Sequence, residues 1–145
     1  VDRYLDRDLE ALLPDARAGL QLFRGKANCW LCHTEPNFSD DRYHNTGVAW
    51  RAGSPSDLGR AAVTGRDEDR GAFKTPTLRE VARTGPYMHD GSFAALEEVV
   101  DYYDRGAQPN RGLDPRIRPL NPDARERREL VAFLKSLSGR VTEGK

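Results

Sequence analysis

The chain has 145 residues, and its 23 Lys and Arg residues balance 23 Asp and Glu residues, so the formal net charge is zero. This balance argues against nucleic-acid binding, which usually requires a basic face, and no apolar run of about 18 residues is present that could span a membrane. Only 37% of the residues are hydrophobic, while Gly contributes 13 and Pro 9. A chain so rich in loop-forming residues is expected to need a further apolar component in its core.

Two helices are expected before the first cysteine. Apolar residues at helical spacing predict a helix over residues 1–13, on a stripe made of Leu5, Leu9, Leu12 and Leu13. Pro14 is expected to end that helix, and Asp15 to cap a second one that stops at Gly25.

The rest of the chain predicts short helices between long loops. Residues 34–56 are expected to form a loop, because Gly, Pro and Asn interrupt them repeatedly. Capping residues and apolar spacing predict the remaining helices over residues 57–63, 76–82, 92–104 and from 121 to about 139. No strand-like alternation is evident. The expected fold is therefore all-α, with about five helices and long loops.

The most informative stretch is Cys29-Trp30-Leu31-Cys32-His33. It is the C-x-x-C-H arrangement that marks covalent attachment of a c-type haem. Two thiols three positions apart can reach the two vinyl groups of one porphyrin, and the next residue offers an imidazole to the iron. The sequence thus predicts one haem c bound by Cys29 and Cys32, with His33 as the proximal ligand.

Two other interpretations of this motif are less well supported. A zinc site would need a second pair of ligands, and no other Cys-His cluster occurs in the sequence. A thioredoxin-like redox motif would need a βαβ setting, which the sequence does not indicate.

Several longer phrases appear in a fixed order around the motif. They include residues 36–40 (PNFSD), 43–48 (YHNTGV), 73–79 (FKTPTLR), 86–93 (PYMHDGSF) and 96–103 (LEEVVDYY). Together they resemble the C-terminal haem domain of bacterial di-haem cytochrome c peroxidases and their MauG-like relatives, from about Gly19 to Gly139. Members of that family carry two haem motifs, whereas this chain has one.

The resemblance implies a cytochrome c-like haem domain over residues 19–139, preceded by a helical extension (1–18) and followed by a tail (140–145). It implies haem redox chemistry in the bacterial periplasm, with the export signal lying outside this chain. The expected role is electron transfer to or from a second haem domain or a redox partner protein. A stand-alone electron carrier and a single-haem peroxidase are the alternatives, so enzymatic activity of this chain alone is left open.

The resemblance also places a distal iron ligand on the helix over residues 92–104. Tyr103 occupies the family's ligand position, and helical spacing puts it on one face with Leu96, Val99 and Val100. A phenolate ligand stabilises ferric iron and lowers the reduction potential. Met88 is the alternative distal ligand.

Other polar residues are expected around the haem rather than on the iron. Arg79 is expected to pair with a haem propionate, His44 to hold a loop or a propionate, and His89 to form hydrogen bonds near a domain interface. In the relatives, carbonyls equivalent to those of Thr84 and Pro86 help to bind calcium, so a calcium ion is possible here with an incomplete ligand set.

Overall fold

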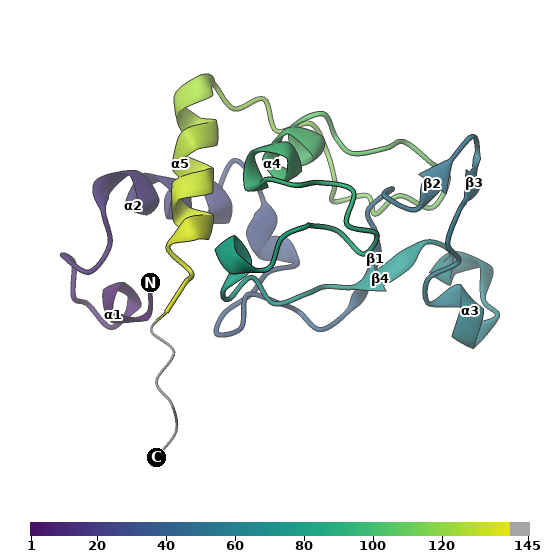
Figure 1. Ribbon diagram of the computed structural model, residues 1–145, viewed down its shortest axis with the longest axis horizontal. Helices are drawn as coiled ribbons and strands as arrows, with labels where there is room; N and C mark the ends of the chain where they lie inside the picture. The colour runs from purple at the N-terminus through teal and green to yellow at the C-terminus, as the bar shows by residue number, and fades with distance from the viewer. Residues whose placement is uncertain (140–145) are drawn as a thin grey trace, which may run out of the picture.

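The computed structural model describes residues 1–139, in which the chain forms five α-helices, three short 3-10 helices and four short strands (Figure 1). In chain order these are α1 (Asp2–Leu5), α2 (Pro14–Arg24), a 3-10 helix (Cys29–Leu31), β1 (Tyr43–Asn45), β2 (Trp50–Arg51), β3 (Ser54–Pro55), α3 (Ala61–Thr64), a 3-10 helix (Asp67–Asp69), β4 (Ala72–Lys74), a 3-10 helix (Val81–Arg83), α4 (Leu96–Asp104) and α5 (Ala124–Lys135). The number of α-helices agrees with the expected five, but the helix expected over residues 76–82 is absent, and the prediction of an all-α chain was only partly correct. No helix among the described residues is long and apolar enough to cross a membrane.

The main hydrophobic core lies where α2 crosses α5, at the end of the molecule that also holds α1 (Figure 1). Phe23 of α2 and Phe133 of α5 are fully buried, with ring centroids 4.9 Å apart. Phe38, from the loop after the cysteine motif, completes this aromatic group at 6.2 Å from Phe23. The core thus holds the loop that follows His33 directly against α2 and α5.

The two helices approach closely because α2 has a glycine at the crossing. A Cβ atom added at Gly19 would lie 1.9 Å from the carbonyl oxygen of Glu129 in α5. At its own start, α5 is fixed by a capping box in which Asp123 accepts from the backbone N–H of Glu126 and Glu126 accepts from that of Asp123.

The short strands lie at the opposite end of the molecule, beside α3 (Figure 1). β1 pairs antiparallel with β4, with Tyr43 opposite Lys74 and Asn45 opposite Ala72. This pairing brings residues 43–45 alongside the start of the phrase at 73–79. Strands of two or three residues carry too little alternation to be recognised in a sequence.

Three predicted elements were wrong. The helix expected over residues 1–13 is limited to α1, and Pro14 is the first residue of α2 instead of a terminator, a position that suits the fixed φ of proline. Residues 76–80 form no helix, and only a 3-10 turn follows at Val81–Arg83. α4 begins at Leu96 and not just after Ser92, because the Glu98 carboxylate accepts hydrogen bonds from the backbone N–H groups at 94 and 95.

The helix α2 runs across the expected boundary between residues 18 and 19. Leu12 and Ala16, which precede that boundary, are buried in the same core as Leu20. The expected tail, residues 140–145, lies outside the described residues.

Candidate functional site

The cysteine motif forms one tight turn at the end of a loop from α2. The turn starts after Asn28, whose backbone is left-handed (φ 53°), and the carbonyl of Cys29 accepts from the backbone N–H groups of Cys32 (3.2 Å) and His33 (3.0 Å). Both cysteines are free of any disulfide and partly buried. Burial raises the pKa of Cys29 to about 12, and it also raises the pKa of Cys32. Both side chains are therefore neutral thiols at pH 7 in the protein alone.

His33 is oriented by the loop that follows it. Its Nδ1 lies 2.8 Å from the carbonyl oxygen of Phe38, so the ring donates its Nδ1 proton to that carbonyl. Burial lowers the pKa of His33, and the Phe38 carbonyl opposes this effect. The ring is thus neutral at pH 7 and keeps the lone pair of Nε2, which is the arrangement required of a metal-binding histidine.

The loop that orients His33 is itself held by the phrase at residues 73–79. The Ser39 hydroxyl donates to the Thr75 carbonyl at 2.8 Å, and the Thr77 hydroxyl donates to the Asn37 carbonyl at 2.6 Å. These hydrogen bonds explain why this phrase is extended where a helix was expected, since its polar groups serve the neighbouring loop. These hydrogen bonds join residues 36–40 and 73–79 into one structural unit that supports His33.

Arg79 belongs to the same unit, but its guanidinium points toward the N-terminal segment. It pairs with Asp2 through two hydrogen bonds, of 2.7 and 2.9 Å, and its Nε donates to the Pro36 carbonyl at 2.9 Å. The side chain therefore holds α1 and the loop at 36 together. Pairing of Arg79 with a haem propionate stays a prediction, and it would have to replace the pairing with Asp2.

Tyr103 of α4 lies opposite the cysteine motif. Burial raises its pKa well above the usual range, and the nearby Cys29 and Cys32 raise it further, whereas a hydrogen bond with Thr46 lowers it. Its neighbour Tyr102 is used differently, because its hydroxyl donates to the Thr46 carbonyl at 2.9 Å. The rings of the two tyrosines lie 5.5 Å apart, and Tyr103 is the one whose pKa the two thiols affect.

The other distal candidate lies in the turn before α4. Met88 is partly buried and has a left-handed backbone (φ 69°), in a turn closed by a hydrogen bond from the Tyr87 N–H to the Phe93 carbonyl. The adjacent His89 is stacked on Phe73, with ring centroids 3.6 Å apart. This stacking keeps the His89 ring against β4.

A partly buried charged cluster lies beside Cys32, and the sequence identified only part of it. His44 is held between two carboxylates, with Nε2 2.8 Å from Asp40 and Nδ1 2.9 Å from Asp114. Arg116 pairs with Asp114 through Nε (2.9 Å) and Nη2 (2.7 Å). We call Asp40, His44, Asp114 and Arg116 the charged cluster. Asp114 and Arg116 come from a loop 70 or more residues after His44, and no local pattern marked them.

The charged cluster keeps both carboxylates ionised to low pH. The Arg116 guanidinium holds the pKa of Asp114 at about 2, against the opposing effect of burial. Burial alone would raise the pKa of Asp40, but hydrogen bonds from Arg42, Thr75 and His44 lower it to about 2. The cluster thus places two negative charges and one permanent positive charge next to the motif.

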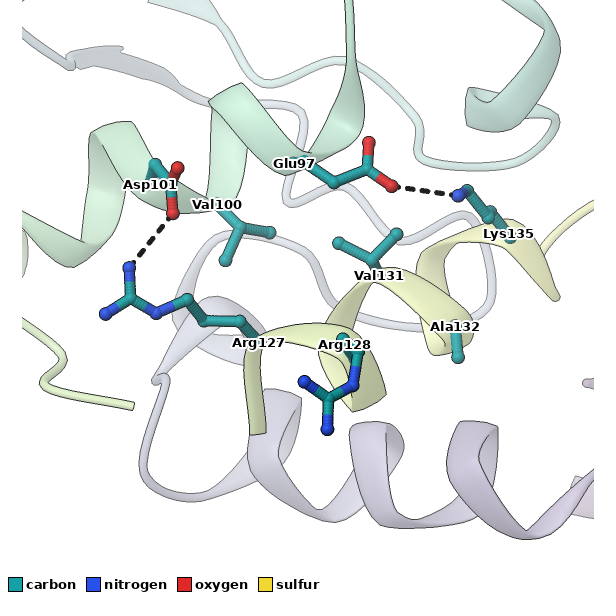
Figure 2. A pocket seen from close by; sticks show the side chains of 8 residues that line it. All are labelled: Glu97, Val100, Asp101, Arg127, Arg128, Val131, Ala132 and Lys135. Atoms are coloured by element: carbon teal, nitrogen blue, oxygen red, sulfur yellow. Dashed lines mark hydrogen bonds and ion pairs between the residues drawn. The ribbon is translucent and has the colours of Figure 1, made fainter. Parts of the chain in front are cut away.

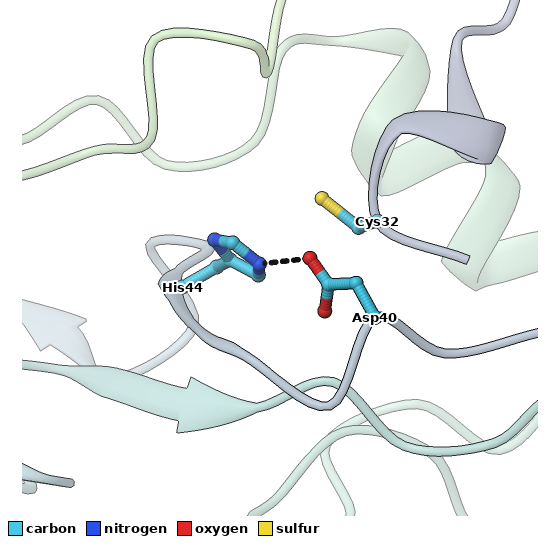
Figure 3. Close-up of side chains that lie close together, drawn as sticks. All are labelled: Cys32, Asp40 and His44. Carbon is cyan, nitrogen blue, oxygen red and sulfur yellow. Dashed lines mark hydrogen bonds and ion pairs between the residues drawn. The ribbon is translucent and has the colours of Figure 1, made fainter. Parts of the chain in front are cut away.

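Figure 3 shows that Cys32, Asp40 and His44 lie close enough to hold a metal ion, since their ligand atoms are within 4.8 Å of one another. Both ring nitrogens of His44 already have polar neighbours, however: Nε2 lies beside Asp40, and Nδ1 lies beside Asp114 and 2.8 Å from the Arg116 guanidinium. The third ligand, Cys32, is also one of the two motif thiols. The three side chains therefore compete with haem attachment for the same sulfur.

A groove of about 410 Å³ lies away from this motif, between α4 and α5 (Figure 2). Glu97 pairs with Lys135 across it at 2.9 Å, and Asp101 pairs with Arg127 at 3.1 Å. These ion pairs link the two helices, and the groove is open to solvent. None of the predicted site residues lines this groove.

Similarity to known proteins covers nearly the whole chain. The chain is 42% identical over 136 residues to the methylamine utilization protein MauG of Methylorubrum extorquens, covering 94% of this chain and 38% of that protein. It is 36% identical over 164 residues to the cytochrome-c peroxidase IdrP1 of Pseudomonas sp. strain SCT, covering 94% and 43%. The chain is a homologue of MauG and the cytochrome c peroxidases. No family model matches it.

Solved structures agree with this relationship. The fold superimposes on a MauG-like protein associated with microbial copper homeostasis with a TM-score of 0.84 and 32% identity, over 89% of this chain and 48% of that one. The diheme peroxidase BthA of Burkholderia thailandensis has the same fold, with a TM-score of 0.64 at 22% identity, over 88% and 43%. The chain spans less than half the length of each of these relatives.

The homology bears on the two possible uses of Cys32. The relatives are haem redox proteins, so the predicted resemblance to them is confirmed and haem is supported as the cofactor. Two thiols, a neutral imidazole with a free Nε2 and a facing tyrosine are a donor set that fits a c-type haem. The charged cluster lies beside one of these thiols, that of Cys32.

Proposed function

We propose that this chain binds one haem c covalently through Cys29 and Cys32, with His33 as the proximal iron ligand. The observation that carries the proposal is the hydrogen bond from His33 Nδ1 to the Phe38 carbonyl, which orients the imidazole next to the cysteine turn and leaves the lone pair on Nε2. When bound, the haem supplies reversible one-electron chemistry at its iron, with a potential set by the axial ligands and by burial.

Tyr103 is the proposed distal ligand. This assignment is supported by its burial on α4 and by its proximity to both thiols. In the protein alone its raised pKa keeps the phenol protonated, and a bound ferric ion would favour the phenolate. Met88 is the alternative, on a turn whose backbone is fixed by the hydrogen bond between Tyr87 and Phe93.

The proposed role is electron transfer within a di-haem peroxidase or MauG-like oxidoreductase. The chain covers 38–48% of the relatives described above, which leaves room in such proteins for a second haem domain. A filled distal position on this haem would keep peroxide away from its iron, so peroxide chemistry is assigned to the second haem domain. Export to the periplasm and calcium binding near Thr84 and Pro86 remain part of the proposal.

The first experiment is expression with the c-type haem maturation system, followed by denaturing mass spectrometry. One haem should remain attached per chain, and acid-acetone extraction should release none. The variant with both Cys29→Ser and Cys32→Ser is the control, which should lose the attached haem. Haem extracted freely from the parent chain would refute covalent attachment.

The second experiment separates electron transfer from catalysis in the same sample. Peroxide reduction with an artificial donor should be well below the ordinary enzyme range of roughly 1–10³ per second, while reduction at an electrode should be rapid and reversible. Turnover within that range would identify the single domain as a peroxidase in its own right.

A further inference from the structure

Residues 105–118 form an exposed basic loop, which we call the arginine loop. It contains four exposed arginines, Arg105, Arg111, Arg116 and Arg118, and its single acidic residue is Asp114, so its net charge is +3. Arg116 and Asp114 neutralise each other by pairing. The other three arginines form no ion pair within residues 1–139. In a chain of zero net charge, this loop is a local concentration of unpaired positive charge.

The arginine loop lies against the cysteine motif. Arg116 donates from Nη1 to the Leu31 carbonyl at 3.3 Å. Leu31, between the two cysteines, is 43% exposed. An apolar residue at the surface of the motif is therefore bordered by a basic loop.

We propose that the arginine loop and Leu31 together form the docking surface for an acidic one-electron carrier protein. The inference rests on the proposed function, because it assumes that electrons enter or leave at the motif. An apolar centre with a charged rim is the usual composition of a transient protein interface, in which arginine is enriched. Opposite charges on the partner would steer encounter and set orientation, and this effect is strongest for weak, short-lived complexes.

The charged cluster gives the loop a defined position. Asp114 binds His44 and Arg116 at once, and its backbone N–H donates to the Asn45 carbonyl at 2.9 Å. These contacts attach the middle of the arginine loop to β1. The unpaired arginines on either side, Arg111 and Arg118, are thereby presented from a fixed support.

The test is binding of an acidic plant-type ferredoxin to the haem-loaded chain, with the basic mitochondrial cytochrome c as the opposite-charge probe. Dissociation constants are measured at about 10 mM and about 150 mM salt, between which the Debye length falls from about 30 Å to about 8 Å. We expect ferredoxin to bind at low salt, to bind at least about tenfold more weakly at high salt, and to bind more tightly than cytochrome c.

The decisive variant combines Arg111→Glu with Arg118→Glu and should weaken ferredoxin binding by at least about tenfold at low salt. Its matched control combines Arg7→Glu with Arg128→Glu, two exposed arginines outside the loop, and makes the same change in net charge. Equal weakening by both pairs, or tighter binding of cytochrome c than of ferredoxin, would overturn the proposal.

The haem content of each sample separates this proposal from the proposed function. A chain that carries one covalent haem but fails to bind ferredoxin refutes only the docking surface. A chain without covalent haem that still binds ferredoxin through Arg111 and Arg118 refutes only the haem assignment.

Discussion

Asp114 is the residue on which the charged cluster depends. Its carboxylate accepts hydrogen bonds from the guanidinium and backbone of Arg116, and one of its oxygens lies 2.9 Å from Nδ1 of His44. The substitution Asp114→Asn keeps the shape of the side chain but removes its charge. It also turns one acceptor into an N–H donor, which must face either the Arg116 or the His44 donor.

The cost of this change follows from the pKa of Asp114. The carboxyl pKa falls from the ordinary value of 3.8 to about 2 in the folded protein, and each pKa unit corresponds to about 1.4 kcal/mol. The ionised carboxylate thus contributes about 2 kcal/mol to the free energy of unfolding at pH 7. Its side chain is only 11% exposed, so solvent screening reduces this value little.

The sign of the pH dependence is also fixed. Because the folded pKa lies below the unfolded value, the stabilisation is complete above about pH 5 and is lost as the pH falls through 3.8 toward 2. Urea unfolding of the parent chain and of Asp114→Asn should therefore differ by about 2 kcal/mol at pH 7 and pH 5. The two proteins should converge near pH 2.

The control is Asp67→Asn, which removes an exposed partner of Arg70. A surface ion pair of this kind contributes less than about 1 kcal/mol. The reasoning fails if Asp114→Asn costs no more than this control at pH 7. It also fails if the difference between the parent and Asp114→Asn persists unchanged near pH 2. At that pH protonation should have removed the contribution of the Asp114 charge from the parent.

Two further substitutions test the helix crossing and the distal ligand. Gly19→Ala should lower the free energy of unfolding by about 3 kcal/mol in a urea titration, because its Cβ would lie 1.9 Å from the Glu129 carbonyl oxygen and the helices must separate. The control is Gly139→Ala, whose Cβ meets only a flexible side chain. It should change the free energy of unfolding by less than about 0.5 kcal/mol. Tyr103→Phe should alter the ferric visible spectrum and raise the reduction potential, because a phenolate ligand stabilises ferric iron. Met88→Leu should leave both unchanged, and the reverse pattern would make methionine the distal ligand.

The part of the site that was predicted from the sequence is the part encoded by neighbouring residues. The spacing of Cys29, Cys32 and His33 lies within one turn, so the motif carries its own geometry. The different orientations of Tyr102 and Tyr103 follow from the rotation of about 100° between successive helical residues. Both inferences need only local regularity.

The polar surroundings of the motif could not be predicted in the same way. Arg79 and Arg116 are equally ordinary arginines in the sequence, yet Arg79 pairs with Asp2 and Arg116 lies beside Cys32. The choice depends on contacts between residues more than 70 positions apart. A single sequence contains no periodic pattern that indicates such long-range contacts.

The helix predicted over residues 76–82 failed for a related reason. Thr75-Pro76 is a good local signal for a helix start, but Thr75 and Thr77 have partners elsewhere, on Ser39 and Asn37. Each hydrogen bond of this kind contributes about 1 kcal/mol, which exceeds the helix propensity that a few residues can supply. Tertiary hydrogen bonds therefore overrode the local preference.

Residues 36–40 are held from two sides, and this has a consequence for His33. The phrase at 73–79 binds this loop through Ser39, while His44 binds it through Asp40. Between these attachments lies Phe38, whose carbonyl orients His33 and whose ring is buried between α2 and α5. A 3-10 turn of three residues has almost no stability of its own. The direction in which His33 presents Nε2 is thus set by the hydrophobic core and the charged cluster together, and not by the motif that contains it.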